Sequence, residues 1–312
     1  RGGAFIESNR RQAMLVEGAR PLRNLTGLAI GNALSVDGTH YLLLPGPPRE
    51  MKPMFENDAT AWLKELLGEA AVLHSVVLRF AGIGESALED MLIDLISQQT
   101  DPTIAPYAKE GEVLIRVSTK AANPQEADRK FEAVLREIRK RTDKYLYAEE
   151  DIPIEAAVMR LLSDQGRTVA LAESCTGGMV SQMLTSLPGS SKVLLGSVVS
   201  YTNPVKHGML GVPEELLEGE GAPGAVSEET AIAMAEGVRK AIGADFGLSV
   251  TGVAGPGPSE GKPAGLVYLS LAEKGKPART EKLLLSGDRE GIRIRAAKRA
   301  LYLLWLALTS RL

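Results

Sequence analysis

"RTVALAESCTGGMVSQMLTSLPG" (residues 167–189) is the stretch that decides the fold of the C-terminal half. Its first eight residues contain the apolar run "VALA" (169–172) and predict a buried β strand, and the part from Cys175 onward predicts a helix. In α/β folds, loops that follow the carboxyl ends of strands carry the functional site. The stretch therefore predicts a layered fold and also where its site lies.

Residues 151–312 continue this alternation of strand and helix. The hydrophobic pattern predicts strands in 191–203 and 244–258, a hairpin in 265–287, and helices in 153–166, 227–243 and 288–312. Ser227 is placed to cap its helix, with two glutamates in the first turn. The fold class expected for this region is α/β, with the site at the strand ends.

The N-terminal 150 residues divide into two further regions. Residues 1–72 read as the C-terminal part of a domain whose front half is missing, with a strand-like segment, a Gly-Pro-Pro turn and a helix from Met51 to Leu67. Residues 73–150 read as a small α+β unit. Its "GIGE" (82–85) does not match the GxxG loop with which such units bind RNA, so RNA binding is not favoured.

The composition excludes several classes of protein. A chain of 312 residues predicts two or three domains. The net charge of −3 and the 4% of aromatic residues argue against nucleic-acid binding. One cysteine and three histidines offer no zinc-site spacing. The apolar run 300–308 covers about half a membrane span, so a buried helix and a cytoplasmic protein without a membrane partner are expected.

Three loops in 151–312 carry unusual polar residues at predicted strand ends: "AESCTGG" (172–178), "SYTNPVK" (200–206) and "VTGVAGPG" (250–257). Glycines between a strand and a helix expose backbone N–H groups, which can bind phosphate or a developing oxyanion. One such loop is weak evidence, but three within one domain indicate a site.

The side chains of the first loop point in different directions if the turn is helical, because neighbours then differ by about 100° around the axis. Cys175 is better explained as a small buried hydrophobic residue than as a nucleophile. Ser174, taken alone, is better explained as the N-cap of the following helix.

Lys206 changes this balance. If Asn203 is the N-cap and Pro204 the first helical residue, Lys206 lies near the positive end of the helix dipole. That position lowers the pKa of a lysine and suits a neutral general base. Tyr201 is close enough to relay a proton or to hold the lysine. A surface lysine with a tyrosine that closes the strand end explains these residues equally well.

The motifs "LAESCTGG", "SYTNPVK", "GAVSEETA" and "TGVAGP…KPAG", in this order, resemble the C-terminal domain of the CinA family, which is related to nicotinamide mononucleotide deamidases. The segments "NRRQAMLVEGARPLRN" and "LLLPGPPREM" resemble the second half of that family's molybdopterin-binding-like N-terminal domain. Residues 73–150 resemble its KH-like domain. The resemblance implies a multidomain α/β protein whose 151–312 region is a three-layer α/β/α domain.

The resemblance also implies an amidohydrolase of pyridine nucleotide salvage, which converts nicotinamide mononucleotide into nicotinate mononucleotide and ammonia and needs no cofactor. The family's serine nucleophile, tyrosine and lysine correspond to Ser174, Tyr201 and Lys206. The expected oxyanion donors are the backbone N–H groups of Thr176, Gly177 and Gly178. The expected substrate-binding residues are Thr251, Gly252, Ala254 and Gly255.

Two other functions follow from the same resemblance. One is a divalent-metal-dependent ADP-ribose pyrophosphatase in the N-terminal domain, of which Gly46, Pro47, Pro48 and Glu50 would form only one wall. The other is a non-enzymatic protein associated with competence or DNA damage. The loop "AGPGPSEGKPAG" is shorter than is usual in the family, which leaves its ligand contacts open. A homodimer is expected, although the apolar face of the closing helix (Leu301, Leu304, Trp305 and Leu308) is better explained as core than as a dimer seam.

Overall fold

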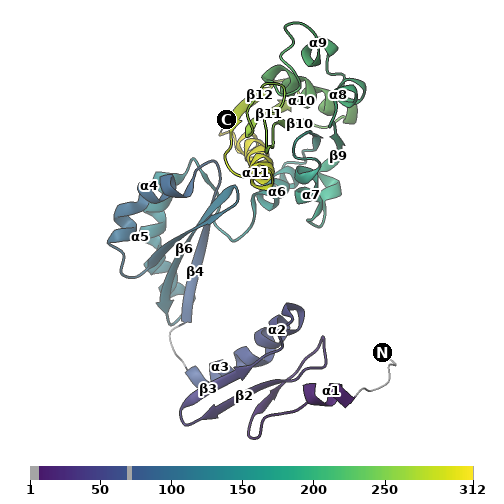
Figure 1. The fold of residues 1–312 in the computed structure, drawn as a ribbon. Coiled ribbons are helices and arrows are strands. Elements are labelled where there is room, and N and C mark those ends of the chain that lie inside the picture. Colours follow the sequence, from purple (N-terminus) through teal and green to yellow (C-terminus); the bar gives the residue numbers. More distant parts are fainter. Residues whose placement is uncertain (1–6, 69–71, 312) are drawn as a thin grey trace. The chain divides into compact units, whose positions relative to one another are not determined.

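The computed structural model describes residues 7–68 and 72–311, in two compact units that divide between Val72 and Leu73 (Figure 1). Each unit has its own sheets and its own core. The first unit is a small α/β arrangement, and the second holds two sheets, so the fold is multidomain and mixed α/β as the sequence predicts.

The first unit contains a three-stranded antiparallel sheet with helices before and after it. Its strands are β1 (Arg20–Leu22), β2 (Gly31–Val36) and β3 (Thr39–Leu43), and its helices are α1 (Glu7–Gln12), α2 (Pro48–Met54), the π-helical turn η1 (Phe55–Ala59) and α3 (Thr60–Leu67). Asp37 and Gly38 both have positive φ angles, which fits a tight two-residue hairpin turn. The strand-like segment is thus two strands, and Trp62 and Met54 close its core.

The region 73–150 of the second unit contains a four-stranded sheet in the order β5-β6-β4-β7, with two helices packed against it. The elements are β4 (Val72–Phe80), α4 (Glu85–Ser97), β5 (Thr103–Lys109), β6 (Glu112–Ala121), α5 (Pro124–Thr142) and β7 (Leu146–Ala148). Strand β5 was not predicted, because a proline interrupts its pattern. It pairs antiparallel with β6 along its whole length.

The C-terminal region is a three-layer α/β/α domain, with helices around a central sheet (Figure 1). The sheet has five strands in the order β12-β11-β10-β8-β9. Its strands are β8 (Val169–Glu173), β9 (Leu194–Val199), β10 (Phe246–Gly252), β11 (Leu266–Glu273) and β12 (Arg279–Leu284). Strand β8 runs parallel to both of its neighbours, β10 and β9. The carboxyl ends of these three strands therefore meet at one edge of the sheet.

Helices cover both faces of this sheet. One layer contains α6 (Ile154–Asp164), α7 (Met179–Thr185) and α11 (Arg289–Leu308), and the other contains α8 (Asn203–Leu210), α9 (Glu214–Leu217) and α10 (Glu228–Ile242). A short 3₁₀ turn, η2 (Ser190–Lys192), precedes β9. The Ser227 hydroxyl caps α10 by accepting the Thr230 N–H at 3.2 Å, as predicted.

The apolar face of α11 lies in the core. Leu301, Leu304, Trp305 and Leu308 are all buried within the cluster that also contains the sheet, so the core interpretation of this face is confirmed. In residues 7–68 and 72–311 no helix combines the length and apolarity needed to cross a membrane.

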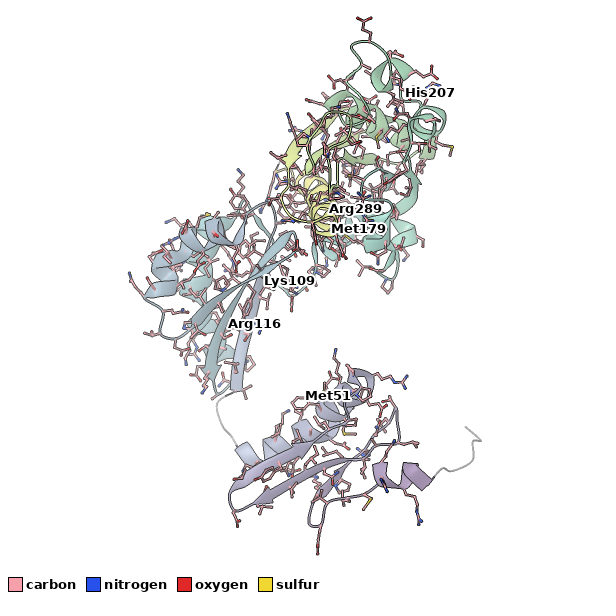
Figure 2. All side chains as sticks on the ribbon, in the orientation of Figure 1. Met51, Lys109, Arg116, Met179, His207 and Arg289 are labelled. Carbon is pink, nitrogen blue, oxygen red and sulfur yellow. The ribbon has the colours of Figure 1, made fainter. Side chains whose placement is uncertain are left out.

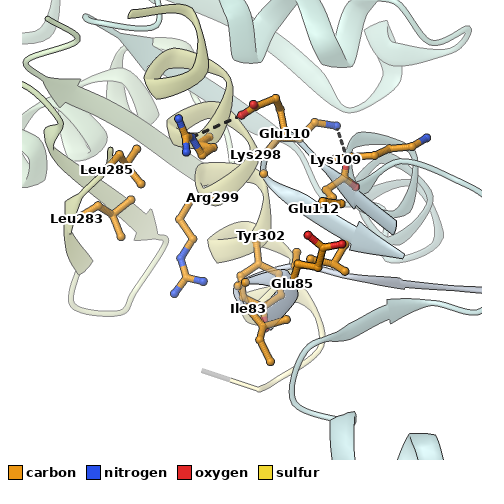
Figure 3. A pocket seen from close by; sticks show the side chains of 17 residues that line it. Ile83, Glu85, Lys109, Glu110, Glu112, Leu283, Leu285, Lys298, Arg299 and Tyr302 are labelled. Carbon is orange, nitrogen blue, oxygen red and sulfur yellow. Dashed lines mark ion pairs between the residues drawn. The ribbon is translucent and has the colours of Figure 1, made fainter. Parts of the chain in front are cut away.

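Charged side chains join the two regions of the second unit. The tip of the β5–β6 hairpin packs on α11 so closely that a Cβ on Gly111 would lie 2.9 Å from Lys298 Cβ. Beside it, Lys298 Nζ forms ion pairs with Glu112 at 2.8 Å and with Glu155 at 2.6 Å. Figure 3 shows the Lys298–Glu112 pair on the wall of a cavity of about 770 Å³. The Tyr147 hydroxyl also hydrogen-bonds Glu112, so this carboxylate has several buried partners.

Candidate functional site

A pocket of about 420 Å³ opens where β8, β9 and β10 end. Three loops meet there because the strands are parallel and their carboxyl ends lie at the same edge. The pocket wall includes seven of the predicted site residues: Ser174, Tyr201, Lys206, Thr251, Gly252, Ala254 and Gly255. Cys175 also lines it.

Ser174 and Lys206 are in direct contact. Lys206 Nζ lies 3.2 Å from Ser174 Oγ and donates a second hydrogen bond of 2.7 Å to the Ser200 carbonyl. Lys206 is only 1% exposed. Within the described parts of the chain, no carboxylate lies within ion-pair distance of Lys206 Nζ. A hydroxyl and a carbonyl are thus the partners of a buried amine.

Burial lowers the pKa of Lys206 below its ordinary value, because the charged ammonium loses its hydration. The negative charge of Glu260 opposes this effect and partly restores the pKa. The sequence attributed a lowered pKa to the helix start instead. Thr202, rather than Asn203, is the N-cap of α8, so Lys206 lies one residue deeper in the helix than expected, and burial is the main cause.

Ser174 lies in a turn ahead of α7, so the expectation that the helix begins at Cys175 is wrong. The helix begins at Met179, after Gly177 and Gly178, which have φ angles of 61° and 94°. Such positive angles favour glycine, and they reverse the chain between strand and helix. The side chain of Ser174 is therefore placed by a turn and faces Lys206.

Glu173, which the sequence analysis missed, caps α7 in place of Ser174. Its carboxylate accepts hydrogen bonds from the N–H groups of Gly178 at 3.0 Å, Val180 at 3.1 Å and Ser181 at 2.9 Å. A carboxylate is well suited to the positive end of a helix. The signal was an acidic residue at the end of an apolar strand, where charge is otherwise costly. Because Glu173 caps the helix, the Ser174 hydroxyl remains available to the pocket.

The same cap changes the candidate oxyanion donors. The N–H of Gly178 is bound to Glu173, and the N–H of Gly177 donates to the Ser174 carbonyl at 3.1 Å. The N–H of Thr176 has no partner among the described residues, but Thr176 is fully buried. None of the three predicted donors lines the pocket, so the structure does not bring them to the site as expected. The Thr176 hydroxyl is likewise buried without a hydrogen bond among the described residues.

Cys175 belongs to the hydrophobic core. It is 7% exposed and packs in the cluster that contains Val180 and Leu184. Burial raises the pKa of its thiol to about 12, so almost no thiolate exists at neutral pH. These properties agree with the small buried hydrophobic residue expected from the sequence.

Tyr201 lies at the rim of the pocket and is 59% exposed. Its hydroxyl accepts a hydrogen bond of 3.3 Å from Arg289, whose other terminal nitrogen donates to the Gly255 carbonyl at 2.6 Å. Among the described residues Tyr201 forms no hydrogen bond with Lys206, whose partners are Ser174 and Ser200, so the expectation that Tyr201 holds this lysine is wrong. Arg289, labelled in Figure 2, is the first residue of α11. Sequence reasoning missed Arg289, since it lies 34 residues beyond Gly255 in an ordinary charged helix start.

The glycine-rich loop contributes backbone to the pocket more than side chains. The Thr251 hydroxyl donates to the Ala225 carbonyl at 2.7 Å and is fully buried, so it holds two segments of the wall together. Glu260, further along the loop, lines the pocket and accepts a hydrogen bond of 3.4 Å from the Val226 N–H. Glu260 is the second pocket residue that the sequence analysis did not identify.

The other predicted residues lie in the first unit. Pro47 is the N-cap of α2, Pro48 is its first residue, and Glu50 accepts a hydrogen bond of 2.7 Å from the Asn24 side chain. Gly46 precedes them in the loop after β3. A search of residues 7–68 and 72–311 finds no group of three acidic, histidine or cysteine side chains able to hold a metal ion.

Two family models match the chain. The CinA C-terminal domain matches residues 151–308, and the KH domain of damage-inducible protein CinA matches residues 75–148. The chain belongs to the CinA family. The CinA-like proteins of Dictyoglomus thermophilum and Dictyoglomus turgidum are 48% and 46% identical to it over 295 residues, which are 94% of this chain and 70% of each relative.

Solved structures of CinA proteins resemble part of the chain. That of the competence/damage inducible protein CihA from Agrobacterium tumefaciens is 39% identical, with 50% of this chain and 95% of that chain covered and a TM-score of 0.46. The CinA superfamily protein from Klebsiella pneumoniae 700603 is 30% identical, with 50% and 96% covered and a TM-score of 0.47.

Proposed function

We propose that the C-terminal domain of this CinA protein is an amidohydrolase that converts nicotinamide mononucleotide and water into nicotinate mononucleotide and ammonia. The observation that supports this is the buried contact of 3.2 Å between Lys206 Nζ and Ser174 Oγ. A serine beside a lysine of lowered pKa is a nucleophile with its own base, and no metal is needed for such chemistry.

The reaction begins when neutral Lys206 removes the proton from Ser174 Oγ. A neutral amine keeps two N–H groups and one lone pair, so it can donate to the Ser200 carbonyl and still accept the serine proton. Ser174 Oγ then attacks the amide carbon and forms a tetrahedral intermediate.

The intermediate collapses when the protonated Lys206 gives its proton to the amide nitrogen. Ammonia leaves, and the acyl group remains on Ser174. Water, activated by the same lysine, then hydrolyses this ester and releases the carboxylate product. In the first half Lys206 passes the serine proton to the leaving ammonia, and in the second half it passes a proton from water back to Ser174 Oγ. The enzyme therefore ends unchanged.

The nucleotide phosphate lies against residues 252–255 in this proposal. Backbone at this glycine-rich loop can approach a phosphate closely, and Arg289 places a guanidinium beside it through its bond to the Gly255 carbonyl. Tyr201, bound to Arg289, helps to position that guanidinium and closes the pocket rim.

The test is ammonia release from nicotinamide mononucleotide by the purified chain. Wild-type protein should release ammonia and form nicotinate mononucleotide in equal amounts, and Ser174→Ala should lose at least about 10³-fold in kcat. Ser191→Ala, which alters an exposed serine in the same domain, is the matched control and should retain full activity. No ammonia from the wild type, or an active Ser174→Ala variant, would contradict the proposal.

A further inference from the structure

The pocket contains one carboxylate and one guanidinium in addition to the Ser174–Lys206 pair. Glu260 reaches from the β10–β11 loop to the Val226 N–H, whereas Arg289 reaches from α11 to the Gly255 carbonyl and Tyr201. The two charges are thus bound to different parts of the wall. Both residues line the same cavity of about 420 Å³.

Neither charge is strongly neutralised by a neighbouring side chain. Lys262 lies 3.7 Å from Glu260, but its ammonium donates its short hydrogen bond, 2.6 Å, to the Pro223 carbonyl. Glu260 is 38% exposed, and an ion pair of that length and exposure is weak. For Arg289, the described part of the chain supplies a carbonyl and a phenol but no carboxylate partner.

Glu260 lines the same pocket as Ser174 and Lys206, so its carboxylate faces the space in which the amide reacts. Its negative charge also opposes the effect of burial on the pKa of Lys206. When Ser174 attacks the amide carbon of a substrate, the ring that carries the amide must lie in the electric field of the Glu260 carboxylate. A positive ring is stabilised by that field, and a neutral Lys206 does not repel it.

We propose that Glu260 selects substrates whose amide is carried by a positively charged ring, so that the pocket accepts a zwitterion with its cation toward Glu260 and its phosphate toward Arg289. This inference rests on the proposed function, since nicotinamide mononucleotide has a cationic pyridinium ring and an anionic phosphate. It adds that the ring charge, and not only the amide and the phosphate, is recognised.

A simpler role for Glu260 is to tune Lys206 alone. In that case Glu260→Gln shifts the pH dependence of kcat to lower pH, because the pKa of Lys206 falls further, and leaves the preference between ring forms unchanged. Recognition of the ring charge instead changes affinity for the cationic form and leaves affinity for a neutral form unaltered. The two roles are therefore separable by comparing ligands that differ only in ring charge.

The experiment compares nicotinamide mononucleotide with its reduced 1,4-dihydro form, which keeps the amide and phosphate but has a neutral ring. Binding of each to the Ser174→Ala protein is measured by calorimetry, so that turnover does not interfere. The oxidised form should bind about tenfold tighter or more, a difference of ~1.4 kcal/mol. Adding Glu260→Gln should bring the ratio of the two dissociation constants close to one. Adding the exposed control Glu220→Gln should leave this ratio unchanged.

The outcomes separate this inference from the proposed reaction. The inference is overturned if the two ring forms bind equally well with Glu260 intact, or if the preference for the oxidised form is unchanged by Glu260→Gln. This holds even if the wild type releases ammonia. A Glu260-dependent preference without ammonia release supports the recognition and overturns the reaction. Absence of binding by either form to the Ser174→Ala protein overturns the inference, while ammonia release by the wild type decides on the reaction separately.

Discussion

Two lysines, Lys206 and Lys298, are buried in this C-terminal domain, and their surroundings differ in one respect. Lys298 Nζ lies within 2.8 Å of Glu112 and within 2.6 Å of Glu155. Lys206 Nζ contacts a serine hydroxyl and a carbonyl instead. Lys206 is 1% and Lys298 8% exposed, so both are buried and their main difference is the charge of their partners.

The comparison shows how surroundings decide the role of a buried lysine. Two carboxylates stabilise the ammonium of Lys298, which then joins residues 73–150 to α11. Among the described residues no carboxylate contacts Lys206, so its buried ammonium is poorly solvated and its pKa falls. The first lysine is suited to hold structure, and the second is suited to accept a proton from Ser174.

Removing the amine of Lys206 should have the largest effect. Lys206→Met should lower kcat for ammonia release by about 10³-fold, because Ser174 loses its base. The melting temperature should not fall, since a buried amine is replaced by an apolar side chain of similar length. Steady-state kinetics and thermal denaturation measure the two effects.

The control for this variant is Lys192→Met, which removes an exposed lysine of the same domain and should change neither quantity. If Lys206→Met keeps more than a tenth of the wild-type rate, the amine is not the base.

Removing the amine of Lys298 should act on stability instead. Lys298→Met should lower the free energy of unfolding by about 3 kcal/mol, because Glu112 and Glu155 are left buried without their cation. Urea unfolding followed by circular dichroism measures the change. The triple variant Lys298→Met, Glu112→Gln and Glu155→Gln should recover most of the lost stability. A Lys298→Met protein as stable as the wild type would contradict the stabilising role of these ion pairs.

The pH dependence should reveal the lowered pKa of Lys206. Between that lowered pKa and the ordinary value of 10.5, the folded state binds fewer protons than the unfolded state. The free energy of unfolding should therefore rise with pH in this window, by at most about 1.4 kcal/mol per pH unit, and kcat should rise as Lys206 loses its proton.

Urea unfolding at a series of pH values, in the wild type and in Lys206→Met, isolates this contribution. The variant should lack the rise. An equal slope in both proteins would mean that Lys206 has the same pKa in the folded and unfolded states.

Cys175→Ser should have the smallest effect on activity, although the thiol lies next to the nucleophile. The rate should stay within about threefold of the wild type, and the free energy of unfolding should fall by about 1–2 kcal/mol because a hydroxyl replaces a thiol in the core. Native protein should react with iodoacetamide only slowly, since the pKa of the thiol is about 12. Rapid labelling accompanied by loss of activity would return Cys175 to the site.

The sequence predicted the features that depend on local pattern. Alternating strands and helices placed Ser174 and Lys206 at neighbouring strand ends, and the two residues meet although 32 positions separate them. Apolar periodicity also placed the buried face of α11 in the core. The placement at the strand ends succeeds because the carboxyl ends of parallel strands lie at one edge of the sheet, independent of the segments that connect the strands.

The remaining features depend on tertiary contacts that no local pattern encodes. Glu173 caps α7 only because a turn at Gly177 and Gly178 brings the helix back over the strand end. Arg289 and Glu260 reach the pocket from distant segments with ordinary local composition. The start of α7 was misplaced by several residues, because its cap is a side chain from the preceding strand. The start of α8 was misplaced by one residue, because its N-cap is a threonine rather than the predicted asparagine.

The most direct test of the central claim is the titration of Lys206 itself. Protein labelled with ¹³C-lysine gives an NMR signal for each Cε, and the signal missing from Lys206→Met identifies Lys206. The account predicts that this signal titrates below 10.5, because burial destabilises the ammonium. A midpoint at or above 10.5 would contradict it, since Lys206 would then be charged at neutral pH and unable to take the proton of Ser174.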